Sequence, residues 1–443
     1  MTARQTRRSA LATGSLSAAA IAASASHPAA FSAASEDTLS PSALAKKGKA
    51  RSCIFLWLGG GACQVDTWDP KVVGDPTQGK KKPGSAYAAI DTCVQGVQVC
   101  EHLPMMAQRL DRGTIIRSVN HDVIDEHAAA TNRMHVGRAP TGTTQYASIG
   151  SVVSHELGES GSDVPNYIVM GYPSATRGPG FLGAKHNYIY LIDTEKGPEG
   201  LRRAEDVTPE RLDRRSRLMG KMRDEYRSRF SGYRKVEDYI DAGITGDLLA
   251  GPRFAGVFDL KSEDPALRTK YGNEFGQRCL LARRLVESGV KFIEVSFNLN
   301  FINGTGWDTH NAGQKNQHIL IQELDQAMAT LIDDLESRNL LDSTLIVVGT
   351  EFGRPPEFDG GGGRGHQSRA FSVPIFGGGL KSGLVVGQTD DFGREVVEEP
   401  VSVPDLHATI YAAMGIDPSK ELFDGNRPVP ITDHGHPIAR LFA

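Results

Sequence analysis

The sequence has little cysteine, little net charge and no long apolar run, and each of these absences excludes a class of protein. Five cysteines in 443 residues are too few for a disulfide scaffold. The formal net charge of −4 leaves no excess of basic residues, so we expect neither nucleic acid nor an anionic membrane surface as a partner. No run is long enough to span a bilayer as a permanent anchor. The sequence is therefore consistent with a globular protein of one large or two ordinary domains.

The few cysteines leave two arrangements open. Cys93 and Cys100 flank a segment of six residues and could either pair across this short loop or remain two free thiols. Because the count is odd, at least one thiol stays free. Cys279 lies in a segment with amphipathic helical spacing, so we expect it in the core.

The N-terminus has the pattern of an export signal. Arg7 and Arg8 precede a run of small residues that continues to Ala25, which is the order found in twin-arginine signals. The alternative is a disordered Ala/Ser tail with a chance arginine pair. We expect residues 1–50 to be a signal peptide and linker, with the twin-arginine export machinery as a partner. The mature protein would then be periplasmic or extracellular.

The remainder of the chain alternates between strand and helix patterns. Short, continuous apolar runs predict buried strands at 53–58, 114–119, 291–296, 345–349 and 370–376. Helical spacing and helix-end signals predict helices at 103–110, 126–136, 275–288, 317–339 and 405–414, the last with Asp405 as its N-cap. This alternation predicts an α/β fold for residues 51–443, with a mostly parallel, doubly wound sheet and helices on both faces. Residues 164–271 are irregular and charged, and we expect an insertion or cap there.

Carboxylate and histidine side chains gather just past the predicted strands and in neighbouring loops. These residues are Asp66, His121, His127, Asp308, His310, Glu351 and His366. Ligands of an open α/β sheet bind at the carboxyl ends of its strands, so these segments are expected to meet. Mixed imidazole and carboxylate ligands favour Zn, Mn or Fe over Ca, and we expect one or two divalent ions, zinc or manganese. Taken singly, an Asp-x-His pair is more often a capped turn, and a lone histidine is more often a loop residue.

Several short motifs carry a resemblance to a known family. They lie at 55–70, 275–290, 307–310, 350–354, 366–379 and 405–415. On these motifs the chain resembles the alkaline phosphatase superfamily, which includes sulfatases, phosphopentomutases and cofactor-independent phosphoglycerate mutases. Within it, the chain is similar to an exported branch of mostly uncharacterised, often sulfatase-like proteins, catalogued as domain of unknown function fifteen-oh-one. The resemblance implies an alkaline-phosphatase-like fold with two adjacent metal ions at the strand ends.

The resemblance also assigns roles to individual residues. It implies that Asp66 and Glu351 bind one metal ion, and that Asp308, His310 and His366 bind the other.

Two positions depart from the family's pattern. Phe352 stands where the family has a second histidine ligand, so one metal site has lost a ligand. His127 stands at the position of the nucleophile, counted back from Gly137 and Arg138. No Cys-x-Pro-x-Arg motif is present, which argues against formylglycine sulfatase chemistry. His127 can replace the missing ligand, act as a general acid/base or nucleophile, or simply cap a helix.

The leading hypothesis is an exported, metal-dependent hydrolase of phosphate or sulfate esters that acts through metal-activated water. Its substrate would be a small-molecule or polysaccharide ester. His127 and His121 are the candidate catalytic residues. Arg354 and Arg369 are the candidate anion-binding residues, with an ordinary surface position as the alternative for both.

Two other classes of function remain open. The Phe352 position and the missing nucleophile also suit a catalytically degenerate binding or scaffold protein of the cell envelope. An isomerase or mutase is the third hypothesis, but export argues against it because sugar phosphates are mostly cytoplasmic.

Overall fold

The buried strand β1 (Ser52–Trp57) lies near the middle of a nine-stranded sheet. The computed structural model describes residues 39–140, 144–158, 164–197, 207–249, 254, 256–300, 302–310, 313 and 316–442. In spatial order the strands are β10 (Leu384–Val386), β4 (Gly113–Asn120), β9 (Phe371–Gly377), β8 (Thr344–Gly349), β1, β7 (Phe292–Ser296), β5 (Tyr167–Met170) and β6 (Ile189–Leu191), and β13 (Val401–Ser402) pairs with β4. Strand β9 is antiparallel to β4 and β8, and the other recorded pairings in this sheet are parallel. The predicted mostly parallel sheet is confirmed.

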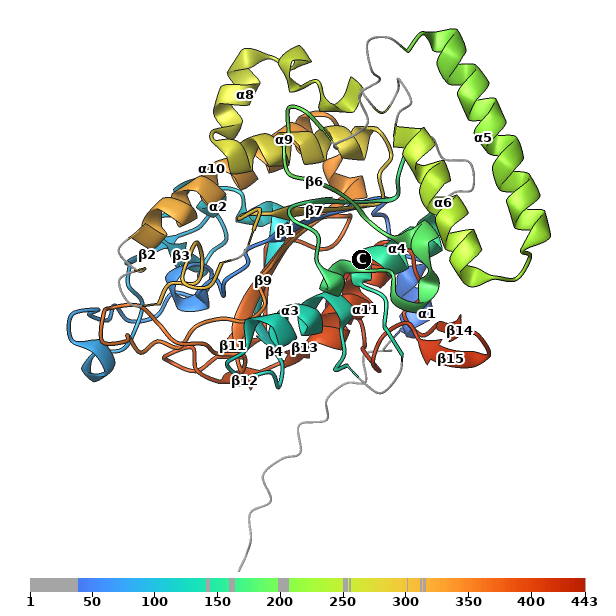
Figure 1. Ribbon diagram of the computed structural model, residues 1–443. Coiled ribbons are helices and arrows are strands. Elements are labelled where there is room, and N and C mark those ends of the chain that lie inside the picture. Colours follow the sequence, from blue (N-terminus) through green and yellow to red (C-terminus); the bar gives the residue numbers. More distant parts are fainter. Residues whose placement is uncertain are drawn as a thin grey trace, which may run out of the picture. The chain divides into compact units, whose positions relative to one another are not determined.

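Helices cover both faces of this sheet, as Figure 1 shows. On one face lie α2 (Pro104–Ala107), α9 (Glu274–Glu287) and α10 (Gln317–Ser337), and on the other lie α3 (His127–Val136), α4 (Ile149–Leu157) and α11 (Val403–Ala413). The shorter elements are α1 (Pro41–Ala45), α8 (Pro265–Tyr271), β2 (Ala89–Asp91), β3 (Gln98–Cys100), β11 (Gln388–Thr389), β12 (Val396–Glu398), β14 (Glu421–Asp424) and β15 (Arg427–Pro430). The predicted doubly wound architecture is therefore present.

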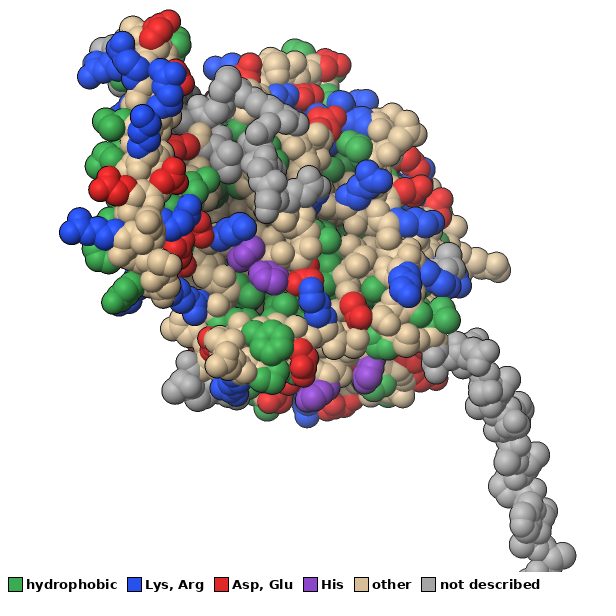
Figure 2. All heavy atoms as spheres, turned by 90° about the vertical axis from the view of Figure 1, so that its right-hand side faces the viewer, with side chains coloured by type: hydrophobic (Ala, Val, Ile, Leu, Met, Phe, Trp, Pro, Cys, Tyr) green, Lys and Arg blue, Asp and Glu red, His purple; other side chains and the backbone are tan. Residues whose placement is uncertain are grey.

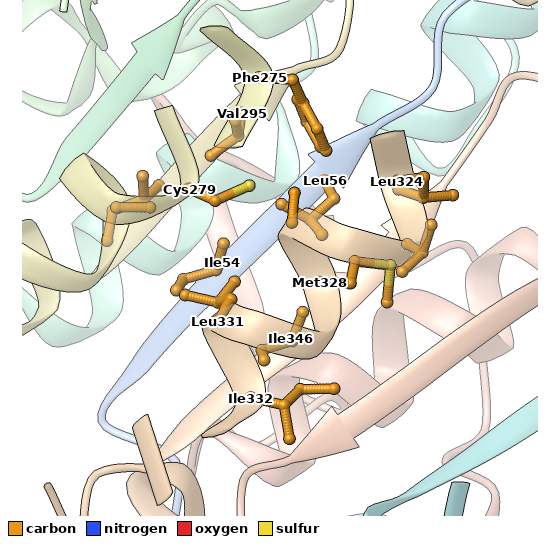
Figure 3. Close-up of a cluster of buried hydrophobic side chains, with 14 of the residues drawn as sticks. Ile54, Leu56, Phe275, Cys279, Val295, Leu324, Met328, Leu331, Ile332 and Ile346 are labelled. Carbon is orange, nitrogen blue, oxygen red and sulfur yellow. The ribbon is translucent and has the colours of Figure 1, made fainter. Parts of the chain in front are cut away.

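Two hydrophobic cores hold these layers together, one on each side of the sheet. Successive side chains of a strand point to opposite faces, so β1 contributes to both cores. Ile54 and Leu56 pack with α9 and α10, and Figure 3 shows them beside Cys279 and Met328. Phe55 belongs to the other core, with residues of α3, α4 and α11. This two-sided burial explains why the strand is continuously apolar.

Two expectations from the sequence need correction, and a third is not tested. The N-cap of α11 is Ser402, while Asp405 completes a capping box by accepting from the Ser402 backbone N–H. Part of the expected linker forms helix α1 (Pro41–Ala45), which buries Leu44 in the core. Residues 1–38, where most of the predicted signal peptide falls, lie outside the described part of the chain.

The expected insertion at 164–271 is smaller than predicted. Strands β5 and β6 fall within it yet belong to the main sheet, because β5 pairs with β7. Helices α5 (Pro209–Arg229) and α6 (Arg234–Leu249) are the peripheral part, and no residue of α5 is buried. Strands of four and three residues are too short for a recognisable sequence period. The described residues from Leu39 onward form one compact unit.

The surface carries mixed charge. Figure 2 shows basic and acidic side chains of the described residues interspersed over one face of the molecule. None of the helices in the described segments is both long and apolar enough to cross a membrane.

We expect one fast-reacting thiol per native chain. All five cysteines are free, and Cys93 is exposed while the other four are buried. Burial also raises the pKa of Cys100 to about 12, which suppresses its thiolate. Titration with a chromogenic disulfide reagent should therefore report Cys93 alone in native protein and all five thiols after denaturation. Two missing thiols in the denatured sample would instead indicate a Cys93–Cys100 disulfide.

Candidate metal centre

Four chain segments bring their polar side chains to one edge of the sheet. Glu351 follows β8, Asp308 and His310 lie in the loop after β7, and His127 begins α3 in the connection after β4. His366 precedes β9, which runs antiparallel to β8, so the start of β9 meets the end of β8. This is the strand-end location where open α/β sheets bind ligands.

Four residues form what we call the histidine–aspartate cluster: His127, Asp308, His310 and His366. One ligand atom from each lies within 4.8 Å of the others, a grouping that could hold a metal ion. Oδ1 of Asp308 is 3.1 Å from Nε2 of His310, 3.4 Å from Nε2 of His127 and 3.8 Å from Nε2 of His366. The Nε2 atoms of His310 and His366 are 2.9 Å apart. Three imidazoles thus direct the same ring atom toward one carboxylate oxygen.

Carboxylates face the opposite ring nitrogens of two of these histidines. Nδ1 of His127 is 2.7 Å from Oε1 of Glu351, and Nδ1 of His366 is 2.8 Å from Oδ1 of Asp125. A carboxylate at Nδ1 holds the proton there and leaves the lone pair of Nε2 available. Metal-binding histidines are typically oriented in this way. The donor set therefore fits a transition metal ion.

Two of the outer carboxylates were not singled out by the sequence analysis. Asp125 is highly exposed, and its φ of 65° lies in the left-handed region that aspartate tolerates better than most residues. Asp359 has its Oδ2 3.6 Å from Nδ1 of His310, a looser contact. Asp125 lies in the loop between His121 and His127, and Asp359 lies in the loop before His366, so only the folded chain reveals which histidine each carboxylate faces.

Charge in the cluster is balanced by a proton and an arginine. Burial alone raises the pKa of Asp308, but the neighbouring imidazoles of His127 and His366, together with Arg354, hold it well below its usual range. Burial alone lowers the pKa of His127, but the nearby carboxylates of Asp308 and Glu351 outweigh it and raise the pKa to about 9. Two buried carboxylates thus attract a positive charge to the position of His127. A divalent cation in the cluster would replace that proton.

Glu351 supports His127 from outside the cluster. Its Oε1 accepts a hydrogen bond of 2.8 Å from the backbone N–H of Gly60 and also faces His127. The φ of Gly60 is 121°, and a Cβ there would lie 2.5 Å from the backbone nitrogen of Asp308. Glycine is therefore required where this loop passes the cluster. The predicted role of Glu351 as a direct ligand finds no support in these contacts.

The structure does not bring Asp66 to the cluster. Its two oxygens accept hydrogen bonds of 2.8 and 2.9 Å from the guanidinium of Arg364, and a third comes from the backbone N–H of Ala86. Both charged side chains are fully buried. A buried arginine thus neutralises the carboxylate that the resemblance assigned to a metal, and we leave Asp66 out of the proposed site.

The predicted anion-binding arginines are also engaged elsewhere. Arg354 is fully buried and pairs with Asp308 at 2.5 Å. Its remaining N–H groups donate to the backbone carbonyls of Gly60, Gly61, Arg364 and Gly365. Arg369 is exposed and pairs with Glu395 at 2.9 Å. Neither residue lines the cavity beside the cluster.

His121 and Phe352 lie beside the histidine–aspartate cluster but are not part of it. Nε2 of His121 is 2.6 Å from the backbone oxygen of Glu351, and the backbone N–H of Val123 donates to its Nδ1. With both ring nitrogens occupied, a catalytic role for His121 is not supported. The ring of Phe352 is fully buried and packs 4.8 Å from that of His127 and 4.6 Å from that of His366.

A cavity of about 620 Å³ opens beside the cluster. His127, Glu351 and His366 line it, together with Thr131 and Arg177. Thr131 lies one helical turn after His127 in α3, so this spacing places it on the same side of the helix. The sequence analysis did not single out Arg177, because this residue lies in the segment predicted to be an insertion.

The protein is thus an α/β protein with a mostly parallel sheet and a histidine–aspartate cluster at the strand ends. The chain belongs to the family described as "Protein of unknown function (DUF1501)", whose profile matches residues 50–442. The predicted membership of this branch is confirmed. No curated protein matches the sequence.

Three of the solved structures that align with the chain are a sulfatase, an alkaline phosphatase and a phosphonate monoester hydrolase. The PsFucS1 sulfatase from Pseudoalteromonas sp. is 14% identical, with a TM-score of 0.40 over 90% of this chain and 73% of that one. The alkaline phosphatase from the Antarctic bacterium TAB5 is 12% identical, with a TM-score of 0.35 over 76% of this chain and 95% of that one. The phosphonate monoester hydrolase SpPMH from Silicibacter pomeroyi is 14% identical, with a TM-score of 0.35 over 77% of this chain and 71% of that one.

Proposed function

We propose that this protein is an exported, metal-dependent hydrolase of phosphate or sulfate esters. The observation that carries the proposal is the convergence of three Nε2 atoms on Oδ1 of Asp308 at the wall of a cavity. A cluster with this donor set, next to a space large enough for a small-molecule substrate, favours an enzyme over an unrelated role.

His127, His310, His366 and Asp308 are the proposed ligands. Three imidazoles and one carboxylate suit zinc or manganese better than calcium or magnesium, which prefer oxygen ligands. When bound, such an ion polarises an ester oxygen and makes a water molecule more acidic. This chemistry needs no protein nucleophile, in keeping with the absence of the Cys-x-Pro-x-Arg motif.

The surrounding residues keep the ligands in place. Glu351 holds the proton on Nδ1 of His127, and Asp125 does the same for His366. Arg354 offsets the charge of Asp308, so the carboxylate stays ionised in a buried position. Phe352 packs against two of the imidazoles and excludes water from that side.

The proposed substrate is a small-molecule or polysaccharide ester outside the cytoplasm. The export part of the proposal rests on Arg7 and Arg8 and the small residues after them, as in twin-arginine signals. Replacing both arginines by lysine should block appearance of the protein outside the cytoplasm, as followed by fractionation.

We expect the zinc- or manganese-loaded protein to release phosphate or sulfate from a broad panel of esters. A chelator should abolish this activity, and one of the two metals should restore it. Glu351→Gln, which keeps the shape but removes the charge behind His127, should lower activity or metal affinity about 10- to 100-fold. Arg369→Gln, an exposed substitution away from the cavity, should leave both unchanged. Metal-loaded protein that cleaves no ester on the panel would disprove the proposal.

A catalytically inactive binding protein is the second candidate. It is favoured by two observations: Phe352 stands at a predicted ligand position, and Arg364 neutralises Asp66. Elemental analysis separates the candidates. Less than one transition metal ion per chain, with a melting temperature unaffected by chelator, would favour the binding protein.

A further inference from the structure

Arg177 is placed differently from the two arginines predicted to bind an anion. It lines the cavity together with His127 and His366, and it is the one lysine or arginine among the described residues that do so. Its side chain is only 10% exposed. Its Nε donates a hydrogen bond of 2.5 Å to Oε1 of Glu294. No hydrogen bond from its two terminal amino groups to a described residue is recorded, so both remain for a ligand.

A buried network fixes the position of this guanidinium. Glu294 lies in the middle of β7 and is fully buried, with Oε2 3.3 Å from Nε2 of His135 in α3. Burial alone raises the pKa of Glu294, but the charges of Arg177 and His135 lower it to about 2, so the carboxylate stays ionised. An ionised group buried in a strand is costly unless it is paired. Glu294 therefore anchors Arg177 through Nε and leaves the outer amino groups of the guanidinium unoccupied.

The chemistry of these amino groups indicates the ligand. A planar guanidinium binds phosphate, sulfate or carboxylate oxygens with two parallel hydrogen bonds, which an ammonium group cannot do. If Arg177 served only to neutralise Glu294, one contact between them would be enough, and the guanidinium would not need to line the cavity. Asp125, Glu126 and Glu351 also line this cavity and would repel an anion, so an anionic substrate needs a local cation in addition to a metal.

We propose that Arg177 binds the anionic oxygens of the substrate through its two terminal amino groups, with Glu294 as its positioning residue. The substrate class is thereby narrowed to esters that keep a negatively charged group, such as phosphate or sulfate monoesters. That the substrate is an ester rests on the proposed function, whereas anion binding at Arg177 can be measured independently of hydrolysis.

The test is binding of inorganic phosphate and of sulfate to the full mature chain by isothermal calorimetry, in both metal-free and zinc-loaded protein. The double variant Arg177→Gln/Glu294→Gln keeps the buried pair neutral and avoids an unpaired carboxylate. We expect it to bind these anions about 10- to 100-fold more weakly in both states, the loss that follows removal of a charge-assisted contact. Arg369→Gln, which removes an exposed arginine, should bind them like the wild type.

The single variant Arg177→Lys provides a second, independent test. It keeps the charge and the pairing with Glu294 but lacks the planar donor pair, so we expect weaker anion binding with an unchanged melting temperature. Anion affinities of both variants within about twofold of wild type would overturn the inference. So would wild-type protein that binds neither anion in either state. Arg177-dependent anion binding by protein that cleaves no ester would leave the inference standing and refute the proposed hydrolysis.

Discussion

Replacing His366 by alanine is expected to abolish stoichiometric binding of zinc or manganese. The change removes one of the three imidazole nitrogens that surround Oδ1 of Asp308. Loss of an outer partner of a ligand typically weakens metal binding about 10- to 100-fold, and loss of a ligand itself should cost more. Competition titration with a chromogenic chelator and elemental analysis measure the effect.

A graded series makes this experiment specific. Asp125→Asn removes only the charge behind His366, so it should weaken metal binding about 10- to 100-fold without abolishing it. His436→Ala removes an exposed histidine outside the cluster and should bind metal like the wild type. If His366→Ala retains wild-type stoichiometry and affinity, the cluster is not the metal site.

Replacing Arg364 by leucine is expected to destabilise the protein by about 3–5 kcal/mol. The substitution leaves the carboxylate of Asp66 buried without its charged partner. It also removes the guanidinium that lies 3.9 Å above the ring of Phe358. The loss should appear as a lower midpoint in chemical denaturation.

Two controls separate the ion pair from other causes. Arg369→Leu breaks an exposed pair with Glu395 and should cost at most about 1 kcal/mol. The double variant Asp66→Leu/Arg364→Leu removes both charges and should recover much of the lost stability. If excess zinc restores wild-type stability to the Arg364→Leu protein, Asp66 is a metal ligand after all, as the family resemblance implied.

The predictable part of the fold lies where the burial of one segment decides its structure. The runs that form β1 and β8 are buried at successive positions because helices cover both faces of the sheet. The helix α3 was predicted with its stop at Gly137, whose φ of 78° suits glycine best. Strands β5 and β6 escaped detection because four and three residues carry no clear period.

The candidate site was predictable to the extent that residue type and strand ends define it. His127, Asp308, His310 and His366 follow or precede predicted strands, and the structure gathers these four. The roles of charged residues were harder to predict. Arg354 was predicted to bind an anion or to lie at the surface, yet it is fully buried, and so is Arg364, for which the sequence made no prediction.

The sequence by itself determined the α/β class, the segments that form most of the sheet, and the residue types available for a metal centre. These follow from local hydrophobic patterns and from the chemistry of histidine and carboxylate. Only the tertiary structure decided which charges neutralise one another. Asp66 and Arg364 are 298 residues apart in the chain, and Arg177 and Glu294 are 117 apart. Whether a buried carboxylate meets an arginine, a proton or a metal ion depends on distances that folding creates, and no local pattern encodes them.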